Sequence, residues 1–360
     1  MLRPRDAVQT LPLYHPPLAR REALKFDFNE NTSGCSPGVL ERLRSLDMEK
    51  LARYPERGPV EKQVARFFRV DFEELLLTNG VDEAIHLLCE TYLEPGDEAL
   101  IVVPTYSMYR IYAMATGAQV TSVALRADFQ FSVDSVVDRI NERTRFIAIA
   151  NPNNPTGTVA SEEDLLEVAR SAPGAGVLID EAYFEFYGQT MLDARREVPN
   201  LFVARTFSKA YGMAGLRVGA LIGNAEHMKF VRRAASPYNV NAIALACLPE
   251  AMRDQDYIGQ YVAEVLESRS RLESVLLNRG IQFWQSRANF VLIRVGASAD
   301  QAAGFVEGMR RRGILVRDRS ADHGYDGCVR ITLGLREHTD HLLAALQETF
   351  EELDIAQGVS

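Results

Sequence analysis

The sequence predicts an α/β protein with a large domain, built on a mainly parallel and helix-covered sheet, and a smaller α+β domain. Three observations lead to this fold class. Short apolar runs alternate with helix-like segments between about residues 75 and 222, a long amphipathic stretch follows residue 241, and strand-like runs with helices between them come after it. Apolar runs without strict polar alternation are typical of strands buried on both faces, as in a parallel sheet.

The large domain is expected to contain a strand–turn–helix unit and a series of buried strands. The unit spans 75–93, and the strands are 98–103, 145–150, 176–180, 201–205 and 217–223. Ligands of open α/β sheets bind beyond the carboxyl ends of the strands. The segments that directly follow these strands are therefore the candidate functional sites.

The pattern changes after residue 241. Residues 244–280 predict one long, kinked amphipathic helix that links the two domains. Strands are expected at 289–294, 314–318 and 328–334, with helices near 299–312 and 338–352. We therefore expect an N-terminal segment (1–45) that packs with the small domain, a large domain (46–241), and an interdomain helix with a small C-terminal domain (242–360).

Composition disfavours several classes of protein. Hydrophobic residues make up 47% and charged residues 25% of the 360 residues, which predicts a folded globular chain. The net charge of −9 is spread along the sequence, which disfavours nucleic acid as a partner. The N-terminus lacks the apolar core of a signal peptide, and no run of about 18 apolar residues occurs. We therefore expect a cytoplasmic protein with no membrane partner.

Cysteine, histidine and glycine spacings predict neither a metal site nor a nicotinamide site. The four cysteines lie far apart without a CxxC spacing, which favours reduced thiols. His338 and His341 lie on an expected helix without a third ligand, so solvated helix residues are favoured over a metal site. The glycines at 212, 215, 219 and 223 do not form GxGxxG between a strand and a helix.

The segment TFSKAYGMAGLRVG (206–219) carries the most chemistry. A lysine after a strand is usually a solvated surface group, so the pair Ser208-Lys209 alone is weak evidence. Here the strand 201–205 ends immediately before it, glycines that permit close backbone approach follow it, and Arg217 lies eight residues on. Thr206, Ser208 and Arg217 together suit a phosphate dianion beside Lys209.

Three further segments place polar groups at strand ends. In the unit 75–93, Asn79-Gly80 forms a turn and Asp82 opens a helix, whose free amides attract phosphate; an ordinary capped helix is the alternative. The segment NPNNPTG (151–157) supplies either a rigid turn or fixed hydrogen bonds to a ligand. Asp180 closes an apolar strand, where a carboxylate is costly unless it meets a cation or a donor.

These motifs together resemble a known family. In chain order they are FDFNEN (26–31), RYPERG (53–58), TNGVDE (78–83), PTYSMY (104–109), NPNNPTG (151–157), DEAYFEF (180–186), TFSKAYGMAGLRVG (206–219), SPYNVN (236–241), ANFVLIR (288–294) and CVRITLG (328–334). The set resembles the class I and II pyridoxal-phosphate aminotransferases of fold type I, and most closely the histidinol-phosphate aminotransferases. The resemblance covers nearly the whole chain in the expected order.

The resemblance implies pyridoxal 5'-phosphate as the cofactor, held by Lys209 as a Schiff base. It implies that Asp180 faces the pyridine nitrogen and that Tyr106 stacks on the ring. Tyr183 and Asn154 match residues that donate hydrogen bonds to the phenolic oxygen. A desolvated, electropositive site favours the neutral amine of a lysine, which is the form that attacks an aldehyde, and a carboxylate keeps the ring nitrogen protonated.

The resemblance also assigns the phosphate of the cofactor and a second subunit. The implied phosphate ligands are the backbone amides of Val81 and Asp82, the hydroxyls of Thr206 and Ser208, and the guanidinium of Arg217. Tyr54 resembles the tyrosine that reaches the phosphate of the neighbouring subunit. A homodimer with shared sites is therefore implied.

Arg330 resembles the arginine that receives the substrate carboxylate through a two-pronged contact, and a buried structural arginine is the alternative. Arg317 and Tyr14 resemble helpers at the same pocket, with Asn29 at its rim. The implied reaction converts L-histidinol phosphate and 2-oxoglutarate to imidazole acetol phosphate and L-glutamate, a step of histidine biosynthesis. One anion pocket then accepts the carboxylate of glutamate and the phosphate of histidinol phosphate in turn.

One departure from the family pattern concerns specificity, and other functions stay open. The family usually has a proline soon after NEN, whereas this chain reads NENTSGCSP near the substrate entrance. An aromatic-amino-acid aminotransferase and a phosphothreonine decarboxylase are the alternatives that keep the cofactor. A pyridoxal-phosphate-sensing regulator is the non-enzyme alternative; such a protein needs an N-terminal DNA-binding module, and only about 25 residues precede the first motif.

Overall fold

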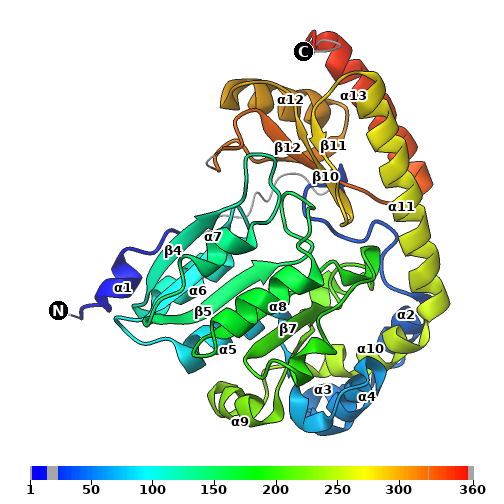
Figure 1. The fold of residues 1–360 in the computed structure, drawn as a ribbon. Helices are drawn as coiled ribbons and strands as arrows, with labels where there is room; N and C mark the ends of the chain where they lie inside the picture. Colours follow the sequence, from blue (N-terminus) through cyan, green and yellow to red (C-terminus); the bar gives the residue numbers. More distant parts are fainter. Residues whose placement is uncertain (1, 14–22, 323, 356–360) are drawn as a thin grey trace.

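The computed structural model describes residues 2–13, 23–322 and 324–355, and this part of the chain contains a seven-stranded and a five-stranded sheet (Figure 1). The strand order is β2-β8-β7-β6-β5-β3-β4 in the large sheet and β1-β11-β12-β10-β9 in the small one. The large-sheet strands are β2 (Leu75–Thr78), β3 (Glu98–Val103), β4 (Gln119–Ala124), β5 (Thr144–Ala150), β6 (Gly176–Asp180), β7 (Leu201–Thr206) and β8 (Gly219–Gly223). The small-sheet strands are β1 (Leu24–Phe26), β9 (Phe283–Trp284), β10 (Phe290–Arg294), β11 (Ile314–Asp318) and β12 (Cys328–Thr332).

Helices cover the large sheet and pack against one side of the small sheet (Figure 1). In the N-terminal half and along the large sheet they are α1 (Asp6–Gln9), α2 (Pro37–Arg44), α3 (Met48–Ala52), α4 (Gly58–Phe68), α5 (Gly80–Tyr92), α6 (Met108–Thr116), α7 (Val133–Val137), α8 (Glu162–Ser171) and α9 (Ala225–Ala234). Further along the chain they are α10 (Ala242–Arg253), α11 (Gln255–Asn278), α12 (Ala299–Arg311) and α13 (Arg336–Glu352). Short 3₁₀ turns are η1 (Phe72–Glu74), η2 (Phe184–Phe186), η3 (Ala194–Arg196) and η4 (Ala214–Leu216).

The large sheet confirms the predicted fold class. The neighbouring strands β4, β3, β5, β6 and β7 all pair in parallel, and β8 runs antiparallel to both β7 and β2. The carboxyl ends of the parallel strands therefore meet at one edge of the sheet. Because β8 is antiparallel, its amino end, which follows Arg217, lies at the same edge.

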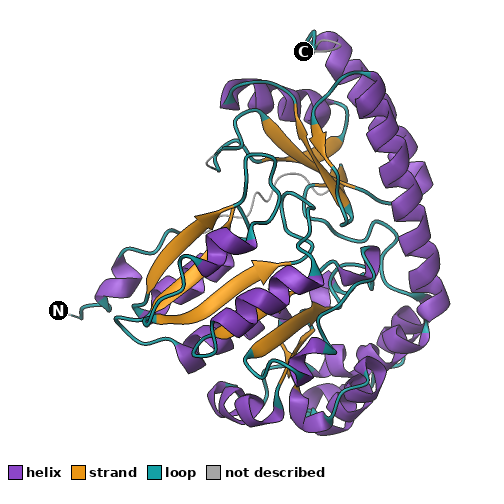
Figure 2. Ribbon diagram, in the orientation of Figure 1, coloured by secondary structure: helices purple, strands orange, loops and turns teal. Residues whose placement is uncertain are grey.

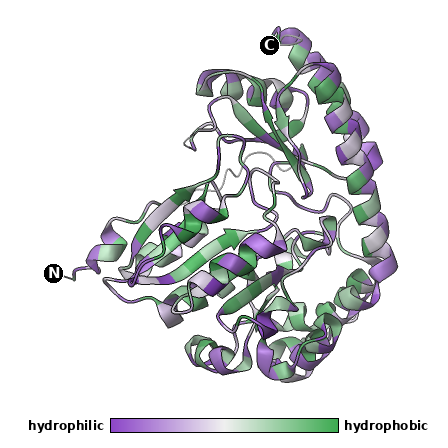
Figure 3. Ribbon diagram, in the orientation of Figure 1, coloured by the Kyte–Doolittle hydropathy of each residue, from purple (hydrophilic) through white to green (hydrophobic). Residues whose placement is uncertain are grey.

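Strand residues alternate between two apolar cores, which explains the unbroken apolar runs in the sequence. In β6, Val177 and Ile179 belong to one buried cluster and Leu178 belongs to the other. Helices lie on both faces of the sheet (Figure 2), and the strands between them are strongly hydrophobic (Figure 3). The strand predictions for 98–103, 145–150, 176–180 and 201–205 are confirmed to within one residue at each end.

The expected single helix over 244–280 is wrong in its continuity. The chain forms α10 and α11 with a break at Asp254, whose ψ of 44° is not helical. The Asp254 carboxylate accepts a hydrogen bond from the backbone N–H of Gly38 at 3.1 Å, while Pro249 lies inside α10 without ending it. α5 likewise begins at Gly80, two residues before the predicted start at Asp82.

Two segments connect the large and small sheets, one from the N-terminal part of the sequence and one from the C-terminal part. α11 runs from the large-sheet side of the molecule towards α13 and the small sheet (Figure 1). β1 pairs in parallel with β11, so a strand near the N-terminus forms the edge of the sheet that the C-terminal strands build. Residues 27–31, which directly follow β1, are thereby brought to the space between the sheets.

Within the described residues, no helix is long and apolar enough to cross a membrane. The same residues contain no group of three or more histidine, cysteine or acidic side chains that could hold a metal ion. All four cysteines lie in the described part and are free thiols.

Candidate active site

One cavity of about 760 Å³ lies at the edge where the parallel strands end, and residues of the small sheet close it. It collects most of the residues that the sequence singles out. Those that line it are Asn29, Val81, Asp82, Tyr106, Asn154, Asp180, Tyr183, Thr206, Ser208, Lys209, Arg217, Arg317 and Arg330. Segments from 29 to 330 in the sequence thus converge on one space.

Lys209 follows β7 and is partly buried in this cavity. Its Nζ donates a hydrogen bond to the backbone carbonyl of Phe28 at 3.1 Å and makes no ion pair with a described residue. Burial, followed by repulsion from Arg330, lowers the pKa of the lysine to about 8. About a tenth of the amine is then neutral at pH 7, far more than for a free lysine with a pKa of about 10.4, and the neutral form is the one that a nucleophile or proton acceptor requires.

Asp180 ends β6 and is 5% exposed. It accepts hydrogen bonds from the hydroxyl of Tyr109 at 2.6 Å and from the backbone N–H of Ala182 at 3.0 Å. Burial raises the pKa of Asp180 to about 6, although the Tyr109 hydrogen bond opposes that rise. A carboxylate with two donors and no paired cation is suited to a cationic atom of a ligand.

Tyr109 is a site residue that the sequence reasoning missed. It lies in α6, is fully buried and lines the cavity. Its position at the end of the motif PTYSMY was visible, but its contact with Asp180 joins residues 71 positions apart. The two residues meet because β3, which precedes α6, and β6, which ends at Asp180, belong to the same parallel part of the sheet.

An anion-binding cradle forms where α5 begins. Its first residue, Gly80, has φ +75°, and a side chain there would meet the guanidinium of Arg217 at 2.5 Å. Arg217 bonds to the Asp82 carboxylate at 2.8 Å and lies 3.4 Å from the hydroxyl of Ser208. The first amides of a helix lack intrahelical partners, so they point with Arg217 and the Ser208 hydroxyl towards an anion.

Thr206 shares the cradle, since its hydroxyl accepts a hydrogen bond from the backbone N–H of Ser208 at 3.1 Å. Tyr106 lies beside Asp82 and donates to its carboxylate at 2.8 Å. The Tyr106 ring meets Tyr109 edge to face, with centroids 5.8 Å apart. Tyr106 therefore presents an aromatic wall next to the anion cradle.

Tyr183 and Asn154 keep protons available for a ligand oxygen. The Tyr183 hydroxyl accepts from the side-chain amide of Asn29 at 2.9 Å, so its own proton is free to be donated. The Asn154 carbonyl oxygen accepts from Arg330, which leaves its amide group as a donor. Both side chains line the cavity, so each can donate a hydrogen bond to a ligand there.

Arginines dominate the part of the cavity that the small sheet supplies. Arg330 is buried and donates to the Asn154 side chain and to the backbone carbonyl of Asp27. Arg317 is its cross-strand partner and lies over the ring of Phe28 at 6.0 Å. This end of the cavity is suited to an anionic group.

Two predicted residues are not placed in the cavity. Tyr54 is 79% exposed and stacks on Tyr238, with ring centroids 4.4 Å apart, outside the cavity of its own chain. Tyr14 lies outside the described residues. Conversely, the sequence reasoning did not select Asp27, Phe28, Arg319 or Asp322, which all line the cavity.

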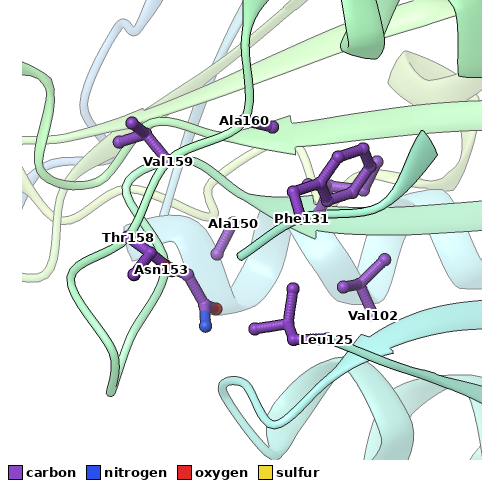
Figure 4. Close-up of a pocket in the computed structure, with 9 residues that line it drawn as sticks. Val102, Leu125, Phe131, Ala150, Asn153, Thr158, Val159 and Ala160 are labelled. Carbon is purple, nitrogen blue, oxygen red and sulfur yellow. The ribbon is translucent and has the colours of Figure 1, made fainter. Parts of the chain in front are cut away.

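A second, smaller hollow lies among β3, β5 and the segments that follow β4 and β5. Val102, Leu125, Phe131 and Val159 line it with other mainly apolar side chains (Figure 4). Its volume of about 10 Å³ holds at most one water molecule. The large cavity is therefore the candidate active site.

The family model described as aminotransferase class I and II matches residues 21–346. The chain belongs to the class I and II aminotransferase family. A histidinol-phosphate aminotransferase of Thermoanaerobacter sp. (strain X514) is 35% identical to this aminotransferase over 329 residues, which cover 90% of this chain and 92% of the relative. The predicted family is thereby confirmed.

Solved structures give the same fold for this aminotransferase. The histidinol-phosphate aminotransferase of Sinorhizobium meliloti, solved in complex with pyridoxal-5'-phosphate, aligns with a TM-score of 0.89 at 24% identity, over 98% of this chain and 99% of that one. The L-threonine-O-3-phosphate decarboxylase of Porphyromonas gingivalis aligns with a TM-score of 0.76 at 21% identity, over 91% and 99%. Aminotransferases and a decarboxylase share the fold, so the fold alone does not choose between the two reactions.

Proposed function

We propose that this aminotransferase uses pyridoxal 5'-phosphate to move an amino group between L-histidinol phosphate and 2-oxoglutarate. The observation that carries the proposal is the convergence of Lys209, Asp180 and two small-sheet arginines, Arg317 and Arg330, on one cavity. The whole-length similarity to a histidinol-phosphate aminotransferase supports this choice of substrate.

The residues present fit the cofactor. The cradle of Gly80, Arg217 and Ser208 suits its phosphate, because a Cβ at position 80 would occupy the space beside the guanidinium. The buried Asp180 suits its ring nitrogen, and the free protons of Tyr183 and Asn154 suit its phenolic oxygen. When bound, pyridoxal 5'-phosphate supplies an aldehyde that condenses with amines and a ring that accepts the electron pair left by proton removal.

Each side chain then has a role that follows from its surroundings. Lys209 Nζ, with its lowered pKa, would act as the base that removes the proton from the Cα of the amino donor and, in its protonated form, as the acid that supplies a proton to the Cα of the new amino acid in the other half-reaction. Asp180 would hold a proton at the ring nitrogen, because a buried carboxylate is stabilised by a cation. Tyr106, beside the phosphate cradle, would pack against the ring.

One anionic group of each substrate binds at Arg330 and Arg317 in this proposal. A carboxylate of glutamate makes a two-pronged contact with one guanidinium in one half-reaction. The phosphate of histidinol phosphate takes the same place in the other half-reaction, where its larger charge suits two guanidiniums. Asn29 fixes Tyr183 at the rim, and Tyr14 belongs to the same pocket in the proposal.

We further propose a homodimer in which Tyr54 reaches the cofactor phosphate of the partner subunit. The exposed stack of Tyr54 and Tyr238 supports this arrangement, since large exposed aromatic side chains mark association surfaces. The proposed domain division is 1–45, 46–241 and 242–360.

Single-turnover conversion of histidinol phosphate, phenylalanine and phosphothreonine by the enzyme loaded with pyridoxal 5'-phosphate tests the substrate. We expect histidinol phosphate to react fastest and to give the keto product without loss of carbon dioxide. Faster reaction of phenylalanine, or release of carbon dioxide from phosphothreonine at a higher rate, overturns the proposed function.

A further inference from the structure

The cavity contains a third arginine, Arg319, whose place follows from the geometry of the small sheet. Arg317 lies opposite Arg330 in the antiparallel pair of β11 and β12, and the ladder continues as the Arg319 N–H donates to the carbonyl of Cys328 at 3.0 Å. Residues two apart on a strand face the same side. Arg317, Arg319 and Arg330 therefore project from one face of the small sheet, and all three line the cavity.

Arg319 is oriented by a short turn. The Asp322 N–H donates to the Arg319 carbonyl at 3.0 Å, which returns the chain so that the Asp322 carboxylate pairs with the Arg319 guanidinium. The Arg319 side chain is 18% exposed, and its Nε is buried with no hydrogen-bond partner in the described part of the chain. Asp322 thus holds one end of the guanidinium and leaves Nε without a partner among the described residues.

The three guanidiniums carry more positive charge than Asp27 and Asp322, the two carboxylates beside them, can neutralise. Arg330 donates to two neutral oxygens, Asp322 pairs with Arg319, and the Asp27 carboxylate lies near Arg330 and Arg317 without an ion pair to either. Burial lowers the pKa of Arg330 to about 10, and repulsion from Arg319 and Arg317 contributes to that shift. An anion in the cavity relieves this repulsion.

We propose that Arg319, positioned by Asp322, is a specificity-determining residue that binds the phosphate of the amino donor and contributes little to binding of a carboxylate. This inference rests on the proposed function for its substrate. A carboxylate has one charge and two oxygens, which a two-pronged contact with one guanidinium satisfies. A phosphate monoester carries a charge of about −1.5 to −2 and three oxygens, so it has a contact left for a third guanidinium.

The first test compares wild type, Arg319→Gln and the control Arg336→Gln as enzymes loaded with pyridoxal 5'-phosphate. Arg336 is an exposed arginine of the same domain that pairs with Glu267 outside the cavity. Histidinol phosphate, histidinol and glutamate are each followed in single turnover. Loss of one charge-assisted hydrogen bond predicts that Arg319→Gln weakens apparent binding of histidinol phosphate about 10- to 100-fold. Histidinol and glutamate should bind as they do to wild type.

Equal losses of apparent binding for histidinol phosphate and histidinol, or no loss for either, overturn the inference.

A second experiment separates the inference from the proposed function. Phenyl phosphate and benzoate are measured as inhibitors of the glutamate half-reaction, because neither probe can react. If Arg319→Gln weakens inhibition by phenyl phosphate and leaves inhibition by benzoate unchanged, the inference stands even when wild type does not convert histidinol phosphate. If inhibition by both compounds weakens equally, Arg319 does not discriminate phosphate from carboxylate.

Discussion

At the scale of residues, the candidate site contains a buried carboxylate that lowers the stability of the fold, and hydrogen-bond donors that offset part of this cost. Asp180 is buried without a paired cation among the described residues, and Tyr109 and Ala182 supply the hydrogen bonds that make it tolerable. The sequence identified Asp180 because a carboxylate at the end of an apolar strand is unusual. It did not identify Tyr109, because a tyrosine in an amphipathic helix has the same pattern whether or not it meets a carboxylate.

Asp180→Asn is expected to stabilise the cofactor-free protein while it abolishes transamination. The folded-state pKa of about 6 lies above the usual value of 3.8, so the folded protein binds the extra proton and loses stability as pH rises through 6. Removing the charge should raise the free energy of unfolding at pH 8 by about 3 kcal/mol, with roughly half of that gain left at pH 5.

Urea denaturation of the cofactor-free protein at both pH values measures this difference. Asp128→Asn is the matched control, because Asp128 is exposed and an asparagine preserves its hydrogen bond to the backbone of Gln130. A stability gain that does not change with pH, or a loss at pH 8, contradicts the account of Asp180.

At the scale of elements, strands were easier to predict than contacts between strands. Burial on both faces gives β5, β6 and β7 unbroken apolar sequences, so their positions could be read directly. The break between α10 and α11 could not, because it lies at Asp254, whose contact with the backbone of Gly38, more than 200 residues away, is not visible in the local sequence. Arg319 was missed for a similar reason, since its place beside Arg330 depends on the pairing of β11 with β12.

The start of α5 provides a test at this scale. Gly80→Ala is expected to weaken retention of pyridoxal 5'-phosphate about tenfold, because the new methyl group displaces the Arg217 guanidinium. Backbone strain at positive φ should also lower stability by about 1 kcal/mol. Equilibrium dialysis measures cofactor retention, and thermal unfolding measures stability.

Gly96→Ala controls for the strain alone. Gly96 also has a positive φ, of +104°, but a side chain there meets nothing within 4 Å. We expect Gly96→Ala to lose similar stability and to retain the cofactor as wild type does. Equal cofactor retention by the two variants would remove the argument for a cradle at Gly80.

At the scale of the whole molecule, the site needs both sheets and, in our proposal, two subunits. β1 brings residues 27–29 from the N-terminal part to the cavity, and the C-terminal strands bring the arginines. Four large hydrophobic side chains are exposed on this part of the chain, namely Met48, Leu51, Tyr54 and Tyr238. The first three are close in sequence, and Tyr238 stacks on Tyr54. A surface of this kind is consistent with association of two copies.

Mixing two impaired variants tests the shared site. Lys209→Ala and Tyr54→Ala are expected to be impaired alone, and heterodimers that form after exchange of subunits should contain one intact site and one doubly altered site. Random pairing of equal amounts predicts activity of about a quarter of wild type. Heterodimers that form, as shown by affinity tags, without a gain in activity contradict the assignment of Tyr54 to the partner's site.

We propose that Lys209 is the residue that holds the cofactor and moves the proton. Borohydride reduction of the enzyme loaded with pyridoxal 5'-phosphate, followed by proteolysis and peptide mass measurement, tests this role of Lys209. We predict a mass increase on the peptide that contains Lys209, and no such product in Lys209→Ala. A wild type that gains no adduct, or that carries it on another lysine, contradicts the account.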